Sequence, residues 1–240
     1  MLTALADGRL LADKTGATPP SVVALHGWAR TGADFASIVD GLDAVAPHLP
    51  GFGASDAPDS AWGSAEYAEL VADAIRPYGP VTIVGHSFGG RVAVRLAAKY
   101  PELVTALVLT GVPLLRLAPV SKPAVSFRLV RWLAKRGILS KDALERQRRK
   151  HGSSDYNAAV GVMREILVKV VNEDYRDDLA KIQAPVRMVW GENDTAAPTD
   201  AGRAAAELVG ASFTVVPGGA HLLEGALRDA VRKELLEVLA

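Results

Sequence analysis

The residue best placed to do chemistry in this sequence is Ser87, which lies in a glycine-rich segment. Residues 85–90 are Gly-His-Ser-Phe-Gly-Gly, preceded by an apolar run over 81–84 and followed by a stretch over 91–98 that predicts a helix. A Gly-x-Ser-x-Gly pattern between a strand and a helix is the context that gives the serine a catalytic meaning. The small residues Gly85 and Gly89 permit a sharp turn that leaves the Ser87 hydroxyl clear at the top of a sheet. The simpler alternative is a glycine-rich connector with an incidental serine.

A serine hydroxyl is a weak nucleophile at neutral pH, so it needs a base and a third group that orients the base. Of the five histidines, His221 has the most suggestive place, because it follows Pro-Gly-Gly-Ala after the last apolar run and precedes the final predicted helix. The glycine pair could carry its imidazole back over the C-terminal edge of the sheet. We therefore expect His221 to be the base, and its alternative is a loop histidine that faces solvent.

The orienting acid should lie between Ser87 and His221 in the chain. After the apolar run over 186–190 comes Gly-Glu-Asn-Asp, which offers both Glu192 and Asp194 at the C-terminal end of a predicted strand. Catalytic groups collect at these ends in open α/β sheets. We favour Asp194 over Glu192, and a solvated turn carboxylate is the alternative for either.

Backbone N–H groups could stabilise an oxyanion formed at this site. The N–H of Phe88 lies at a predicted helix N-terminus, beside Ser87. A second donor is expected from the turn after the strand over 22–25, where His-Gly-Trp follows, and the N–H of Trp28 is the candidate. The same glycine could instead be present only because the turn is tight.

Other features predict less. Arg91 follows the serine turn and could reach a substrate carboxylate, although an arginine there can equally support the helix and neighbouring loops. Residues 51–56 do not form a dinucleotide fingerprint, because Asp56 replaces the third glycine. Histidines and carboxylates show no metal-ligand spacing, so we expect neither a metal nor another cofactor. The basic residues at 146–150 are interpreted as a solvated helix face.

Short apolar runs alternate with amphipathic stretches along most of the chain. The runs predict strands over 22–25, 81–84, 107–109, 186–190 and 213–216, and the stretches predict helices over 34–42, 64–76, 88–99, 199–208 and 225–239. Continuous apolar strands separated by helices indicate an α/β fold with a mostly parallel central sheet flanked by helices. Segments 2–6 and 9–14 flank Asp7-Gly8, which predicts an antiparallel edge hairpin with a two-residue turn.

The alternation stops between residues 113 and 183. This span has three early prolines and no strong strand signal, and it predicts helices near 124–136, 141–150 and 155–171. We interpret it as a helical insertion between two strands of the sheet.

Composition limits the function classes. The 240 residues carry no net formal charge, which argues against nucleic acid as a partner, and they include no cysteine, which excludes disulfides and thiolate chemistry. We see no signal peptide and no apolar run of the roughly 18–20 residues that a membrane helix needs. The expectation is a soluble cytoplasmic protein. Composition does not distinguish a monomer from a homodimer.

Five segments in this order resemble the landmarks of the α/β-hydrolase superfamily. They are the motifs over 26–28, 50–55, 85–90, 191–194 and 219–221. The resemblance spans nearly the whole chain, and it implies a hydrolase core over 1–112 and 184–240 with a helical cap over 113–183. It also implies that Ser87 is the nucleophile, Asp194 the acid and His221 the base. One departure is His48, where many members of this family carry aspartate.

The resemblance implies a serine hydrolase that acts on a small or medium carboxylic ester through an acyl-enzyme. Serine at position 87 argues against the dehalogenases and epoxide hydrolases of this family, which carry aspartate there. Three alternatives stay open: a carbon–carbon bond hydrolase or a menaquinone-pathway-like lyase, an esterase of biotin precursor synthesis, and a sensor that keeps the triad for ligand binding.

Overall fold

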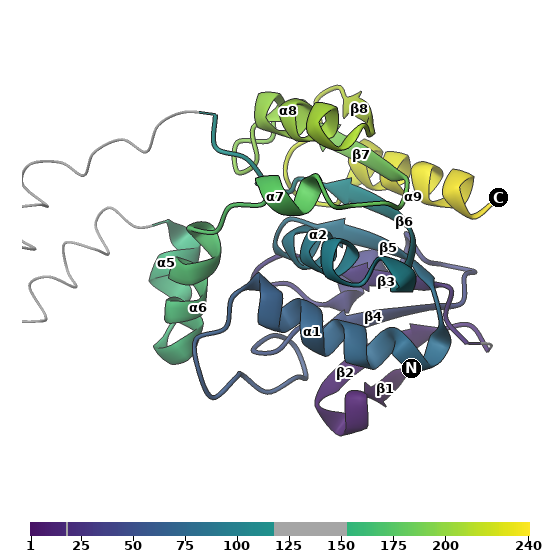
Figure 1. The fold of residues 1–240 in the computed structure, drawn as a ribbon, viewed down its shortest axis with the longest axis vertical. Helices are drawn as coiled ribbons and strands as arrows, with labels where there is room; N and C mark the ends of the chain where they lie inside the picture. Colours follow the sequence, from purple (N-terminus) through teal and green to yellow (C-terminus); the bar gives the residue numbers. More distant parts are fainter. Residues whose placement is uncertain (18, 118–152) are drawn as a thin grey trace, which may run out of the picture.

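The fold is an α/β structure built on a single sheet in the part of the chain that the computed structural model describes, residues 1–17, 19–117 and 153–240. Eight strands lie in the order β1-β2-β4-β3-β5-β6-β7-β8 (Figure 1). Their bounds are β1 (Leu2–Leu5), β2 (Leu10–Thr15), β3 (Val22–Leu25), β4 (Ala44–His48), β5 (Val81–His86), β6 (Val104–Thr110), β7 (Val186–Gly191) and β8 (Ser212–Val216).

Strands β3 to β8 run parallel to one another, while β1 and β2 form an antiparallel hairpin at the edge. Strand β2 joins this hairpin to the sheet by pairing antiparallel with β4. The predicted mostly parallel sheet with an edge hairpin is therefore confirmed. The hairpin connection is longer than predicted. A 3-10 turn over Ala6–Gly8 joins the strands, and both Ala6 and Asp7 have positive φ angles, 48° and 57°.

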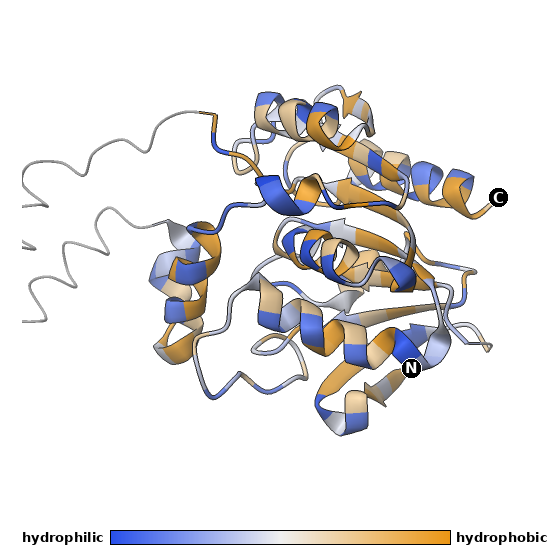
Figure 2. Cartoon of the chain, in the orientation of Figure 1, coloured by the Kyte–Doolittle hydropathy of each residue, from blue (hydrophilic) through white to orange (hydrophobic). Residues whose placement is uncertain are grey.

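Helices cover both faces of the sheet, which explains why the strands are continuously apolar. One face packs against α1 (Ser64–Ile75), α2 (Phe88–Lys99) and α8 (Thr199–Val209), and the other packs against α9 (Gly225–Leu239). Along β3, Val23 and Leu25 belong to the first layer and Val22 and Ala24 to the second. Figure 2 shows strands that are mostly apolar and helices that mix apolar and polar positions.

The predicted helical insertion lies between β6 and β7. Its described part contains α5 (Ser154–Ala158), α6 (Gly161–Val171) and α7 (Arg176–Leu179). The single helix predicted over 155–171 is wrong, because Val160 is extended and Gly161 has a φ of 53°, which breaks the helix in two. The helices predicted over 124–136 and 141–150 lie outside the described residues. The division of the chain at 112 and 183 stays a prediction.

The helix predicted over 34–42 is also wrong. A 3-10 helix over Gly32–Phe35 is followed by successive turns, and Phe35, Ile38 and Val39 are buried as a helix pattern requires. The backbone carbonyls of this segment bond instead to α9, since Arg232 donates to the oxygens of Ser37, Ile38 and Asp40.

Strand β4, over Ala44–His48, was not predicted from the sequence, because its short Ala-Val-Ala-Pro-His sequence lacks a clear apolar run. Within the described ranges, no helix is long and apolar enough to cross a membrane.

Candidate active site

Ser87 occupies a tight turn between β5 and α2. Its φ of 51° is unusual for a residue with a side chain, and its N–H donates to the Thr110 carbonyl at 3.0 Å. Glycine is required on both sides. A Cβ at Gly85 would lie 2.7 Å from the Gly90 Cα, and a Cβ at Gly89 would collide with the Leu25 carbonyl. The local sequence therefore holds the hydroxyl in a strained, defined position at the C-terminal end of the sheet.

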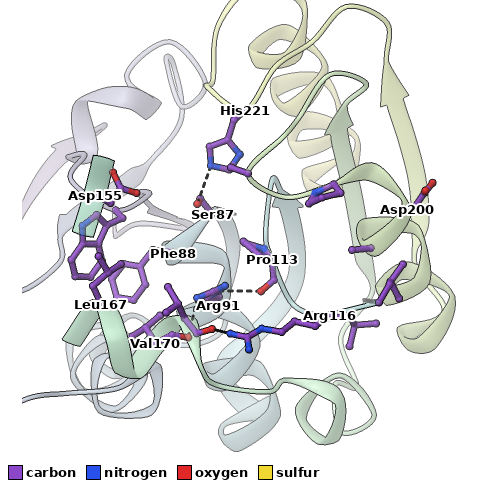
Figure 3. Close-up of a pocket in the computed structure, with 17 residues that line it drawn as sticks. Ser87, Phe88, Arg91, Pro113, Arg116, Asp155, Leu167, Val170, Asp200 and His221 are labelled. Carbon is purple, nitrogen blue, oxygen red and sulfur yellow. Dashed lines mark hydrogen bonds between the residues drawn. The ribbon is translucent and has the colours of Figure 1, made fainter. Parts of the chain in front are cut away.

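Ser87, His221 and Asp194 form one chain of hydrogen bonds. The His221 Nε2 lies 3.1 Å from the Ser87 Oγ, and its Nδ1 lies 2.8 Å from the Asp194 Oδ2. A carboxylate accepts only, so Nδ1 carries the ring hydrogen and Nε2 is free to accept the serine proton. Figure 3 shows the imidazole directed at the Ser87 hydroxyl. The three predicted residues, from three different strand ends, are thus brought together.

Asp194 is held in place from the side opposite the histidine. Its side chain is 1% exposed, and its Oδ1 accepts hydrogen bonds from the N–H groups of Ala196 and Ala197 at 2.9 and 2.8 Å. The other candidate acid points elsewhere, since Glu192 accepts from the Gly218 N–H at 2.9 Å. The geometry therefore places Asp194, and not Glu192, beside the imidazole.

The two residues predicted to supply oxyanion donors lie at the start of α2 and on the turn after β3. Phe88 is the first residue of α2, where helices leave N–H groups without an intrahelical acceptor. Trp28 follows β3, and its ring packs edge-on against Phe88 and Phe52, with centroids 5.5 and 4.9 Å apart. These ring contacts hold the turn after β3 against the start of α2, and the role of the two N–H groups as oxyanion donors stays a prediction.

His26 is a supporting residue that sequence reasoning did not single out. It is fully buried, donates from Nδ1 to the Gly27 carbonyl at 2.7 Å, and accepts at Nε2 from the Leu49 N–H at 2.9 Å. Burial lowers the pKa of His26 to about 4, which keeps the ring neutral. It therefore ties the Trp28 loop to the loop after β4.

His48 fixes the neighbouring loop through both ring nitrogens. Nδ1 accepts from the Ala54 N–H at 2.9 Å, and Nε2 lies 3.0 Å from the Asp13 Oδ2. This histidine thus holds the loop over 50–55 against the edge hairpin.

A cavity of about 670 Å³ opens beside Ser87 and His221. Apolar side chains form most of its wall. The loop after β6, α6 and the loop after β7 supply Pro113, Leu115, Leu117, Leu167, Val170, Val171, Ala196 and Pro198, and Trp28, Phe88 and Ala201 complete the apolar lining. The charged lining residues are Arg91, Arg116, Asp155 and Asp200 (Figure 3). The volume is that of a small-molecule site.

Arg91 lies on the floor of this cavity and links the core to the insertion. Its guanidinium donates to the Pro113 carbonyl at 3.1 Å and to the Val170 carbonyl, near the C-terminus of α6, at 3.0 Å. Burial lowers the pKa of Arg91. Among the described residues, no group of three or more histidines, carboxylates or cysteines could hold a metal ion.

Comparison with known proteins assigns the chain to a family. Residues 22–233 match the model of the alpha/beta hydrolase family, and the chain belongs to this family. The solved structure of an esterase from Exiguobacterium antarcticum superposes with a TM-score of 0.73 at 20% identity, covering 100% of this chain and 99% of that one.

Relatives found by sequence match a smaller part of the chain. A pimeloyl-[acyl-carrier protein] methyl ester esterase from Aromatoleum aromaticum is 27% identical over 210 residues, which cover 75% of this chain and 81% of that protein. An uncharacterised protein from Mycobacterium tuberculosis is 34% identical over 98 residues, so the match spans 38% of this chain and only 29% of that protein's length.

Proposed function

We propose that this chain is a serine hydrolase that cleaves a small or medium carboxylic ester through an acyl-enzyme intermediate. The observation that carries the proposal is the hydrogen-bonded series from Asp194 through His221 to Ser87, with the serine facing a largely apolar cavity. Relatives with esterase names support the same reaction class.

In the first half of the reaction, Ser87 Oγ attacks the ester carbonyl carbon while His221 Nε2 accepts the hydroxyl proton. The carbonyl oxygen becomes an oxyanion, and the N–H groups of Trp28 and Phe88 donate hydrogen bonds to it. Asp194 keeps the ring hydrogen on Nδ1 and stabilises the imidazolium. His221 then returns its proton to the alkoxide oxygen, the carbon–oxygen bond breaks, and the alcohol leaves.

In the second half, water takes the place of the alcohol. His221 removes a proton from this water as the oxygen attacks the acyl carbon, and the same two N–H groups hold the second oxyanion. Collapse of the intermediate breaks the bond to Ser87 Oγ, which regains its proton from His221. The carboxylic acid is released, and the enzyme returns to its starting state.

An ester chain-length series tests this proposal. We expect turnover of short and medium p-nitrophenyl esters by the wild type, because the lining is apolar and the cavity small. Ser87→Ala should lower kcat by about a million-fold, since nucleophile and base act as one unit. Circular dichroism should show that the variant is folded. Slow, near-single-turnover kinetics across the whole series would instead favour a ligand sensor.

We also propose that Arg91 contacts a carboxylate of the substrate at the cavity wall. Matched esters with and without a carboxylate on the acyl chain provide the test. If Arg91 binds substrate, Arg91→Met raises KM for the carboxylate ester alone. An equal loss for both esters would assign Arg91 only to its contacts with Pro113 and α6.

A further inference from the structure

His86 is a buried titratable residue that the proposed reaction does not use. It is the last residue of β5, directly before Ser87, and it is 2% exposed. Its Nε2 lies 2.9 Å from the backbone carbonyl oxygen of His221, and the two imidazole centroids are 4.9 Å apart. The residue beside the nucleophile in the chain therefore contacts the backbone of the base.

The direction of this hydrogen bond is fixed by its acceptor. A carbonyl oxygen cannot donate, so the His86 Nε2 carries a hydrogen and donates it. Burial, with a smaller contribution from the neighbouring His221, lowers the pKa of His86 to about 4. The ring is therefore neutral at ordinary pH, and its one hydrogen remains on Nε2.

The other ring nitrogen of His86 is a buried acceptor that no described residue uses. The His86 Nδ1 is buried and has no hydrogen-bond partner among the described residues. It faces Gly27, where an added Cβ would lie 2.9 Å away. An unsatisfied buried acceptor lowers stability, because the hydration that it loses is not replaced. Retaining a histidine under this penalty points to a task for the Nε2–H donor.

His221 lies in a loop that needs such a donor. The loop after β8 contains Gly218 and Gly219, and its described bonds fix those glycines to Glu192, Asn193 and Val216. Among the described residues, the hydrogen bond to the His221 backbone is the one that its carbonyl accepts from the His86 ring. The bonds to Asp194 and Ser87 orient the His221 ring but do not fix its backbone, which is held by the bond from His86.

We propose that His86 is a positioning residue that holds the His221 backbone so that its imidazole stays within reach of the Ser87 hydroxyl. Because His86 and Ser87 are consecutive, one strand end fixes both sides of the 3.1 Å contact between Oγ and Nε2. This inference rests on the proposed function, since it assigns a role only if His221 is the base.

Two substitutions separate the donor from the bulk of the side chain. His86→Gln places an amide N–H near the position of Nε2, while His86→Met fills similar space with no donor. We expect His86→Met to lower kcat by about 100-fold with KM unchanged, as for an angstrom-scale misplacement of a catalytic group. His86→Gln should restore most of kcat. The rate of fluorophosphonate labelling should follow the same order.

Thr82→Val is the matched control. Thr82 lies on the same strand, is buried, and bonds to the Thr105 hydroxyl at 3.0 Å, far from the site. Loss of this hydroxyl bond should change Tm without changing kcat.

Equal losses in His86→Met and His86→Gln would overturn the positioning role, as would wild-type kcat in His86→Met. If His86→Met does not fold, His86→Gln is compared with His86→Asn, whose shorter amide cannot reach the His221 carbonyl. A higher kcat for Gln supports the role, and equal kcat values overturn it. Full activity of Ser87→Ala would instead contradict the proposed function itself.

Discussion

Asp194 divides its two carboxylate oxygens between different partners. Oδ1 accepts from two backbone N–H groups, and Oδ2 is left for the His221 ring. The backbone bonds remove the rotational freedom of the carboxylate, so the imidazole meets an acceptor in one orientation. The neighbouring Glu192 lacks this setting, because it is exposed and bonded to the next loop.

Substitution of the two acids distinguishes them. Asp194→Asn should lower kcat on the order of ten-thousand-fold while the protein remains folded, because an amide cannot hold the ring hydrogen on Nδ1. Glu192→Gln is the matched control and should leave kcat within a few-fold of the wild type. Steady-state ester hydrolysis measures both. A large loss for Glu192→Gln with a silent Asp194→Asn would show that the acid is misassigned.

At the residue scale, chain order and local glycines were enough to predict which side chains would meet. Ser87 and His221 are 134 positions apart, yet each follows an apolar strand and a parallel sheet brings such ends to one edge. The supporting histidines His26 and His86 could not be predicted in this way. Their roles depend on burial and on which ring nitrogen carries the hydrogen, and neither has a sequence signature.

Among the elements, a group of polar contacts holds the segment between α6 and α7 against α1 and α2. Glu173, between α6 and α7, accepts from the Ser64 N–H at 3.1 Å and from the Tyr175 hydroxyl at 2.6 Å. Arg95 of α2 donates to the Ser64 hydroxyl at 3.2 Å and lies over the Tyr175 ring. A carboxylate from a distant segment thus caps α1, where the helix dipole favours negative charge.

Removing this charge should loosen the insertion. We expect Glu173→Gln to lower the free energy of unfolding by about 1–3 kcal/mol, since partly buried bonds to Ser64 and Tyr175 weaken. Urea denaturation monitored by tryptophan fluorescence gives the value. Glu165→Gln, at an exposed position of α6, is the control and should change it by less than about 0.5 kcal/mol. Equal changes in the free energy of unfolding for the two variants would contradict a stabilising role for Glu173.

The bounds of helices that pack on the sheet could be predicted from the sequence. The bounds could not be predicted where backbone carbonyls bond to a distant side chain instead of to a neighbouring N–H. The helices over 88–99 and 225–239 were confirmed with their bounds. The segment over 34–42 has helical apolar spacing, but Gly41 has a φ of 77° and Arg232 takes up its carbonyls. Apolar spacing within a short segment cannot predict a hydrogen-bond donor that lies 192–195 residues away.

For the whole molecule, two buried neutral histidines make folding sensitive to acid. Burial lowers the pKa values of His26 and His86 to about 4 in the folded state, from the ordinary value of 6.5 for an exposed imidazole. Between these values the unfolded chain binds protons that the folded chain does not. Stability is therefore complete above about pH 6.5 and falls as the pH drops toward 4.

Urea denaturation at a series of pH values from 7.5 to 4.5 measures this loss. We expect the free energy of unfolding to fall on the order of 1 kcal/mol per pH unit for each of the two histidines. His86→Gln cannot take up a proton there, so its stability should fall less steeply than that of the wild type. A flat profile, or identical slopes for the two proteins, would contradict the assignment of buried neutral rings.

The cavity is the part of the molecule that the sequence predicts least. Its walls come from the loop after β6, from α6 and from the loop after β7, which are far apart in the chain. Helical periodicity identifies apolar faces but does not place them over a serine. The size and polarity of the substrate therefore depend on how the folded chain brings these segments together.

The central claim is that Ser87 is an activated nucleophile. Labelling of the folded protein with a fluorophosphonate probe, followed by peptide mapping, tests it most directly. We predict a single phosphonylated peptide that contains Ser87, with labelling abolished in Ser87→Ala and strongly slowed in His221→Ala. No labelling of the wild type, or labelling at another serine that persists in Ser87→Ala, would contradict the account.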